Sequence, residues 1–240
     1  MVTTATASKP VRKTSTQAKP YFTLEEFYAI AEELPERRVE LLNGKLAADS
    51  HFTLAEFNTV AELLPYRRLE LIKGEIKVFP PPDKEHQYLA SRFNMLCAPH
   101  VAEIEALDCF LAGSTNYFEV PESFLNEEGA GPSAINPDAT VCYRDYWYTD
   151  RRPPALLVVE VLSFSNREVA DNDLVTKLEI YAALEIPAYW IIDRRDQSVW
   201  VHTQLRDGEY TLHQQLKAAE VLPAPGLEFL QITPAQIFAK

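Results

Sequence analysis

Apolar and polar positions follow the same order in two consecutive stretches of the chain, residues 21–46 and 51–76. Each stretch begins with apolar residues at helical spacing, continues to a proline, and ends in a short strand-like run before a glycine. Aligned at a shift of 30, the two stretches share 14 of 26 residues. The chain therefore contains a tandem duplication, and each copy is predicted to form a helix followed by short strands.

Both copies begin with a helix-capping sequence. Thr23 and Thr53 are expected to be N-caps, because a glutamate follows each of them after three residues. A proline ends each helix, and short strands are predicted over 39–42, 69–72 and 76–79. The apolar face of the first helix would cost about 1.5–3 kcal/mol for each large side chain left in water. We therefore expect the first copy to dock on its own core or on a second chain as a homodimer.

The remaining pattern is rich in strands. A helix is predicted after the prolines at 80–82, and another over about 171–185. Strands are predicted near 109–119, 138–143, 155–162, 188–193, 198–204, 209–216 and 227–231. This order predicts an α/β (α+β) fold with a central mixed β-sheet flanked by helices and preceded by the duplicated leader. We expect a tail over 1–20, a first leader repeat over 21–50, and one domain over 51–240 that includes the second repeat.

The composition is typical of a globular protein, with 47% hydrophobic and 24% charged residues. Residues 1–20 contain four basic residues and no acidic one, without the apolar block of a secretory signal. They are expected to be a disordered tail, with an organelle transit peptide as the alternative. No apolar run approaches the ~20 residues of a membrane helix. The three scattered cysteines favour a reducing cytoplasm, and the net charge of −12 argues against long-range attraction to nucleic acid.

The run LLVVEVLS at 156–163 contains one acidic residue, Glu160, in a strand expected to be buried on both faces. A carboxylate there loses hydration worth several kcal/mol unless a cation or hydrogen bonds replace the water. Asp138 begins an earlier strand, and in a hairpin symmetric about residue 149 it lies directly opposite Glu160. Such a pair repels unless a hard cation such as Mg²⁺ lies between the two carboxylates. The alternatives for Glu160 are an exposed strand end and a buried arginine partner.

A second unusual position is Lys177 in the helix predicted over 171–185. It lies three residues after Leu174 and four before Tyr181, so it borders the apolar face of that helix. In one interpretation its aliphatic stem lies along apolar surface and its ammonium reaches water. Beside a pair of carboxylates, the ammonium could instead hold a water nucleophile or a substrate phosphate.

These residues occur in an order that resembles the PD-(D/E)XK nuclease superfamily, and in particular the Uma-type restriction endonuclease family of bacteria. The matching pieces are Pro137-Asp138, Glu160-Val161-Leu162-Ser163, Asp173 with Lys177, Leu178 and Tyr181, and the run from Pro187 to Asp193. Upstream, residues 69–76, three prolines and His86 are similar to the family's entry segment. The resemblance covers about residues 51–235 and implies a restriction-endonuclease-like core.

This sequence departs from the superfamily pattern in two places. The usual third motif would place a lysine two residues after the glutamate, where this chain has Leu162. A lysine that has migrated to the next helix, as in the Uma-type proteins, would restore the charge through Lys177. The extra leader copy at 21–46 is also outside the family pattern.

The resemblance implies a Mg²⁺-dependent endonuclease that hydrolyses phosphodiester bonds of nucleic acid, DNA in the first place, with Mn²⁺ able to substitute. Asp138 and Glu160 would hold the metal together with the carbonyl of Val161. Lys177 would orient the attacking water or stabilise the transition state. His86 would contact phosphate or assist proton transfer, and a capping or core role is the alternative.

The duplication ranks the leader glutamates. Glu40 and Glu70 are equivalent, and both are expected to be structural because the first copy has no acidic hairpin attached to it. Glu75 corresponds to Lys45, and only the second copy continues into the prolines and His86. We therefore predict Glu75 as the leader glutamate that assists the site.

Two other classes of function are consistent with the sequence. A binding or scaffolding protein could retain this fold without turnover, which the acidic balance favours because few basic residues remain to grip a duplex. A hydrolase of another phosphorylated substrate is also possible, because fold alone does not determine substrate.

Overall fold

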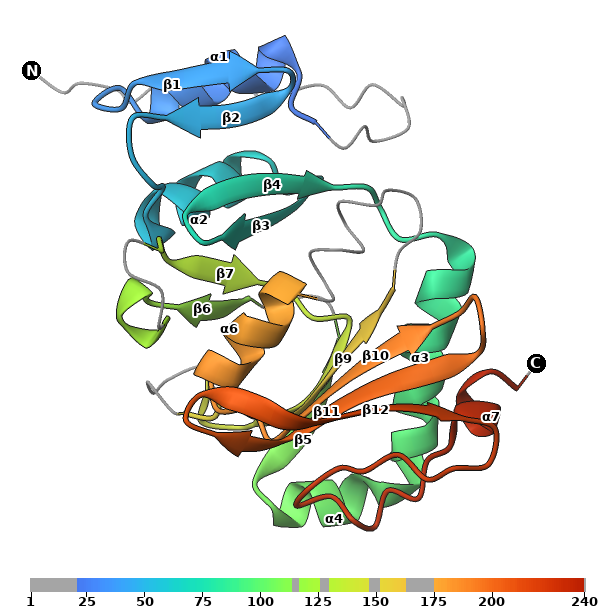
Figure 1. The fold of residues 1–240 in the computed structure, drawn as a ribbon. Coiled ribbons are helices and arrows are strands. Elements are labelled where there is room, and N and C mark those ends of the chain that lie inside the picture. Colours follow the sequence, from blue (N-terminus) through green and yellow to red (C-terminus); the bar gives the residue numbers. More distant parts are fainter. Residues whose placement is uncertain (1–20, 114–116, 126–129, 147–151, 163–174, 240) are drawn as a thin grey trace, which may run out of the picture.

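The computed structural model describes residues 21–113, 117–125, 130–146, 152–162 and 175–239 (Figure 1). The tail predicted over 1–20 lies outside the described residues, so its predicted disorder stays a prediction. The division into a first leader repeat and one following domain also stays a prediction. Within the described residues, no helix has both the length and the apolar character needed to cross a membrane.

The two leader repeats form matching elements. The first contains α1 (Leu24–Glu33), β1 (Val39–Leu42) and β2 (Lys45–Ala48), and the second contains α2 (Leu54–Leu63), β3 (Arg68–Ile72) and β4 (Glu75–Phe79). Both predicted capping boxes are confirmed, with Thr23 and Thr53 accepting from the third helical amide and the glutamates at that position bonding back. In each repeat the two strands form an antiparallel hairpin.

The central sheet has six strands in the order β12-β11-β10-β9-β8-β5 (Figure 1). These are β5 (Cys109–Gly113), β8 (Ala139–Tyr143), β9 (Ala155–Val161), β10 (Ala188–Asp193), β11 (Ser198–Arg206) and β12 (Glu209–Lys217). Among the described strands only β9 and β10 pair in parallel, and the chain between them contains α6 (Lys177–Ala183). A second sheet has the order β4-β3-β7-β6, where β6 is Phe118–Val120 and β7 is Ser133–Ile135.

Helices cover both faces of the central sheet. Helix α3 (Lys84–Cys97) buries Leu89, Phe93 and Cys97 against one face, together with the side chains of Val159 and Val161 on β9. Helix α6 buries Ile180, Tyr181 and Leu184 against the other face, with Val158 of β9. Because successive strand residues point to opposite faces, the uninterrupted apolar run of β9 supplies both cores. The predicted mixed sheet flanked by helices is confirmed.

Two local predictions differ from the structure, and strands β2 and β7 were not predicted. The strand predicted over 109–119 is two strands in different sheets, β5 and β6. Residues 227–231 form turns, in which Leu227 and Leu230 pack into the core at a spacing of three. Strand β7 was missed because glycine and prolines flank its short sequence. The predicted helix over 171–185 is described only from residue 175 onward, and the short helices η1 (Ala98–His100), α4 (Val101–Ala106), η2 (Glu122–Phe124) and α7 (Pro234–Ile237) complete the fold.

The first repeat docks on the second repeat of its own chain. Ile30 and Leu46 share one buried core with Phe57 and Leu71. At the edge of this core Glu26 is 3% exposed, and its Oε1 lies 2.6 Å from Nε of Arg67. Burial raises the pKa of Glu26, but hydrogen bonds from Arg67 and Thr23 outweigh it and leave the pKa below its usual value.

Glu26→Gln should weaken the docking of the first repeat, because it removes the negative charge that pairs with the guanidinium of Arg67. Losing one partner of a buried ion pair costs about 3–5 kcal/mol. Since the folded-state pKa of Glu26 is lowered, its contribution is present above the unfolded pKa and is lost as pH falls through the folded pKa. Hydrogen exchange of the α1 amides should therefore show a large loss of protection at pH 7 that shrinks in acid. Glu25→Gln, at an exposed neighbour, is the control, and equal losses in both variants would contradict this role.

Candidate active site

Asp138 and Glu160 are brought together by the pairing of β8 with β9. Ala139 pairs with Val159, Thr140 with Val158, and Val141 with Leu157, which is the predicted hairpin symmetric about residue 149. Asp138 directly precedes this ladder and Glu160 directly follows it, so the same register puts them opposite each other. In addition, the N–H of Val161 donates to Oδ2 of Asp138 over 2.8 Å.

The carbonyl of Val161 faces the same side as its N–H. In a strand, the N–H and C=O of one residue point toward the same neighbour. Because the N–H of Val161 bonds to Asp138, its carbonyl is also directed toward the β8 side of the sheet. Its predicted role as a metal ligand stays a prediction, and strand geometry agrees with it.

Lys177, in the first turn of α6, contacts two buried carboxylates. Its ammonium lies 2.8 Å from Oε1 of Glu160 and 3.1 Å from Oε1 of Glu70. The residue is 1% exposed, so its ammonium does not reach water along the surface. One turn further along α6, the hydroxyl of Tyr181 donates to Oε1 of Glu160 over 2.7 Å. Helical spacing therefore directs two donors at one carboxylate.

Glu70 is a leader glutamate that contacts Lys177. Glu70 lies in the middle of β3, between β4 and β7, and is fully buried. The side chain of Glu75 is 73% exposed at the start of β4, and its Oε2 lies 4.0 Å from Nζ of Lys77. Glu75 begins β4 and is exposed, away from the buried Lys177. The predicted assistance of Glu75 to the site stays a prediction. Glu40 pairs with Arg38 at 3.0 Å, whereas its equivalent Glu70 contacts Lys177.

Asp138 has two further partners. An Nη2 of Arg68 lies 3.1 Å from its Oδ1, and Nε2 of His86 lies 2.9 Å from its Oδ2. Burial raises the pKa of Asp138, but His86, the charge of Arg68 and the N–H of Val161 outweigh it and hold the pKa well below its usual value. His86 begins α3, where its backbone N–H donates to the N-cap Asp83. It therefore combines a capping position with a side chain aimed at the cluster.

The donor atoms of this site are of the kinds that bind a hard divalent cation. Carboxylates and a backbone carbonyl are the donors that Mg²⁺ and Mn²⁺ prefer. Oε2 of Glu70 is a buried acceptor that has no hydrogen-bond partner among the described residues. Among those same residues no group of three or more His, Cys, Asp and Glu side chains is arranged to hold a metal. The protein would thus offer Asp138, Glu160 and a backbone oxygen, with water completing the shell.

Sequence reasoning missed Glu70, Arg68 and the contact of Tyr181 with Glu160. Glu70 and Arg68 lie on one strand at an interval of two, which places both side chains on one face. That spacing was visible, but the strand lies far in sequence from Asp138 and Glu160. Tyr181 follows Lys177 by four residues, so its position beside the same carboxylate could have been expected.

Comparison with known proteins identifies the family. The Uma2 family, described as "Putative restriction endonuclease", matches residues 54–235. The chain belongs to this family. The match begins inside the second leader repeat, so the first repeat lies outside the part that the Uma2 family shares. No curated protein matches the chain.

A solved structure shows the same fold. The crystal structure of a putative nuclease from Anabaena variabilis matches with a TM-score of 0.52 and 18% sequence identity. The match covers 78% of this chain and 98% of that chain. At this identity the likeness establishes the fold of the Uma2 protein described here.

Proposed function

We propose that the protein is a divalent-metal-dependent endonuclease that hydrolyses phosphodiester bonds of nucleic acid. DNA is the first substrate to test, because the Uma2 family is described as a restriction endonuclease family. The proposal assigns metal binding to Asp138, Glu160 and the carbonyl of Val161. Lys177 is the cationic catalytic residue, and His86 acts beside Asp138.

One observation carries this proposal. The strand register places Asp138 opposite Glu160, and the ammonium of Lys177 lies 2.8 Å from that glutamate, although the three residues come from separate elements. Two opposed carboxylates, with a lysine in contact with one of them, are the charges needed to hold a cation and to contact an anionic phosphate. Membership of the Uma2 family supports a nuclease-like activity for this constellation.

Each side chain has a separate task. A divalent cation bound by the two carboxylates supplies Lewis acidity, which favours ionisation of water and screens charge on the phosphate. Lys177 holds the attacking water or the phosphate oxygen through its Nζ. Tyr181 and Glu70 are positioning residues, because Tyr181 holds Glu160 and Glu70 holds Lys177. Arg68 and His86 keep Asp138 ionised.

A second candidate is a catalytically silent protein with the same fold. The ammonium of Lys177 already lies between two carboxylates, and Arg68 and His86 already contact Asp138. The cluster is also closed to solvent, with Glu160 and Lys177 each 1% exposed. A substrate phosphate therefore reaches these groups only if the cluster opens. These contacts support the competing interpretation, in which the cluster is a structural ion network.

A titration with Mg²⁺ and Mn²⁺ separates the two candidates. The full-length protein should show a rising melting temperature with added metal, by mass action of a ligand that binds the folded state. Supercoiled DNA, single-stranded DNA and RNA are incubated in parallel, and cleavage should require the metal. Stabilisation without cleavage would leave a binding protein or a hydrolase of another phosphorylated substrate. Absence of both responses would contradict the metal site itself.

A further inference from the structure

The contacts between the two leader repeats are reciprocal. Nε of Arg67 lies 2.6 Å from Oε1 of Glu26, and Nε of Arg37 lies 2.9 Å from Oε1 of Glu56. At the shift of 30 that aligns the repeats, Glu26 is equivalent to Glu56 and Arg37 to Arg67. The two ion pairs are therefore equivalent: in one the first repeat supplies the glutamate, and in the other it supplies the arginine.

A second set of contacts follows the same rule. Nη2 of Arg37 donates to the carbonyl of His51 over 3.0 Å, and Nη2 of Arg67 donates to the carbonyl of Tyr21 over 3.4 Å. Tyr21 and His51 are again equivalent positions. Reciprocal contacts of this kind are the signature of an isologous interface, in which the same patch is used on both sides of a two-fold axis.

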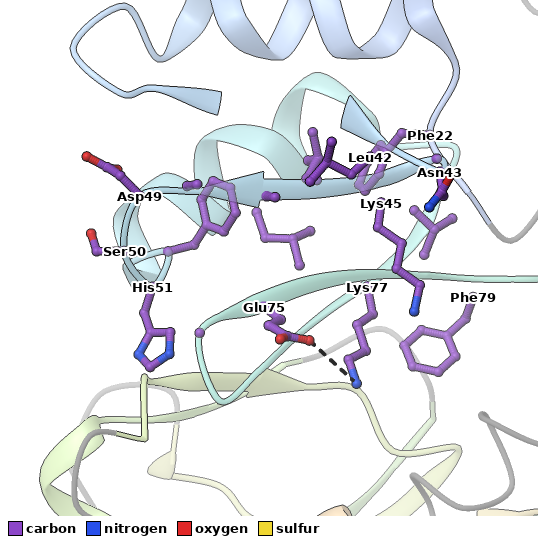
Figure 2. Close-up of a pocket in the computed structure, with 18 residues that line it drawn as sticks. Phe22, Leu42, Asn43, Lys45, Asp49, Ser50, His51, Glu75, Lys77 and Phe79 are labelled. Atoms are coloured by element: carbon purple, nitrogen blue, oxygen red, sulfur yellow. Dashed lines mark ion pairs between the residues drawn. The ribbon is translucent and has the colours of Figure 1, made fainter. Parts of the chain in front are cut away.

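The cavity between the repeats has the same symmetry. It measures about 830 Å³ and lies between β2 and β4 (Figure 2). Its walls pair equivalent positions from the two repeats, such as Phe22 with Phe52, Gly44 with Gly74, and Leu46 with Ile76. The interface inside one chain thus has the form of a symmetric homodimer contact. The symmetry is broken at one pair of equivalent positions, where β2 has Lys45 and β4 has Glu75 (Figure 2).

The Uma2 family shares only one of these repeats. Its match begins at residue 54, inside the second repeat. The second repeat contributes buried apolar side chains, among them Phe52 and Val60, to the core that it shares with Ile30 and Leu46 of the first repeat. Exposing such side chains to water is unfavourable. An isologous face is complementary to itself, so the partner that fits it best is a second copy of the same repeat.

We propose that the leader face, defined by Phe52, Glu56, Val60, Arg67 and Ile76, is a homodimerisation surface. The first repeat occupies it as a covalently attached substitute for a second chain, and so prevents self-association through this face. When the first repeat leaves the leader face, Glu56 of one chain pairs with the partner subunit's Arg67, and the reverse contact is formed as well. The partner for this surface is therefore a second copy of this protein.

The test uses the full chain with exchanged charges. Glu26→Arg combined with Arg37→Glu places like charges opposite Arg67 and Glu56, so the first repeat is repelled from the leader face. The second repeats of two chains remain complementary, and the mass measured by light scattering should be about twice that of the wild type. Adding Glu56→Arg and Arg67→Glu to the same chain makes all contacts complementary again. That quadruple variant should return to the wild-type mass.

Each outcome decides the proposal. A folded double variant with the wild-type mass would overturn it, as would a quadruple variant that keeps the doubled mass. If the double variant is unfolded when dilute, circular dichroism is followed as protein concentration rises. Folding that appears with concentration supports a surface that a second chain covers, and unfolding at every concentration contradicts it. Glu56→Arg with Arg67→Glu alone is a second variant with the same expected doubling.

Discussion

Asp138→Asn is expected to abolish both metal-dependent stabilisation and cleavage. The substitution removes one of two opposed carboxylates while preserving the shape of the side chain. With one charge left, the divalent cation loses much of its attraction, because Mg²⁺ and Mn²⁺ depend on anionic oxygen ligands. Loss of the metal-activated water should lower cleavage by orders of magnitude, to background. Melting temperature and cleavage are measured in the same Mn²⁺ titration.

The control separates this effect from a general change in charge. Asp207→Asn alters an exposed aspartate in the turn between β11 and β12 and should leave the metal response unchanged. Asp138→Asn also removes a charged partner of Arg68 and His86, so its stability without metal should fall. The deciding quantity is therefore the rise in melting temperature caused by metal. A rise equal to that of the wild type would remove Asp138 from the metal site.

The order of elements and the acidic hairpin could be predicted from the sequence because both depend on local patterns. The two capping boxes, the uninterrupted apolar run of β9, and the spacing of Asp138 and Glu160 about residue 149 each involve short stretches of chain. Glu70 could not be found in this way. Its position beside Lys177 depends on the pairing of β3 with β7, a strand of three residues. The glycine and prolines that flank β7 are not typical of a strand, so the sequence does not predict it.

The duplication shows how strongly tertiary context decides the role of a side chain. Glu40 and Glu70 occupy equivalent positions in two similar sequences. Glu70 is buried against Lys177, whereas Glu40 is exposed and contacts Arg38. Among the described residues β1 pairs only with β2, while its equivalent β3 is covered on both edges. Equivalence in sequence therefore correctly predicted the capped helix and the strand that follows it in both repeats, whereas it could not predict that the two glutamates have different surroundings.

Lys177→Met should separate catalysis from metal binding, because it changes the two properties in opposite directions. The substitution retains much of the apolar stem and removes the ammonium that contacts Glu160 and Glu70. Without metal, the buried carboxylates of Glu70 and Glu160 then lose the ammonium that both contact. Loss of one partner of a buried ion pair costs about 3–5 kcal/mol. A divalent cation relieves the repulsion between the carboxylates, so added Mn²⁺ should stabilise Lys177→Met more than the wild type.

Cleavage should respond in the opposite way. A metal-loaded Lys177→Met protein still lacks the Nζ that holds water or phosphate, so its cleavage rate should fall by about 10²–10³-fold, as when one stabilising donor is removed from an active site. Lys84→Met, at an exposed position in the first turn of α3, is the control for loss of a lysine. Rates are compared at saturating Mn²⁺, at a temperature where circular dichroism shows both variants folded. Full cleavage by folded, metal-loaded Lys177→Met would assign this lysine to the structural ion network alone, since metal would then have replaced everything the ammonium contributes.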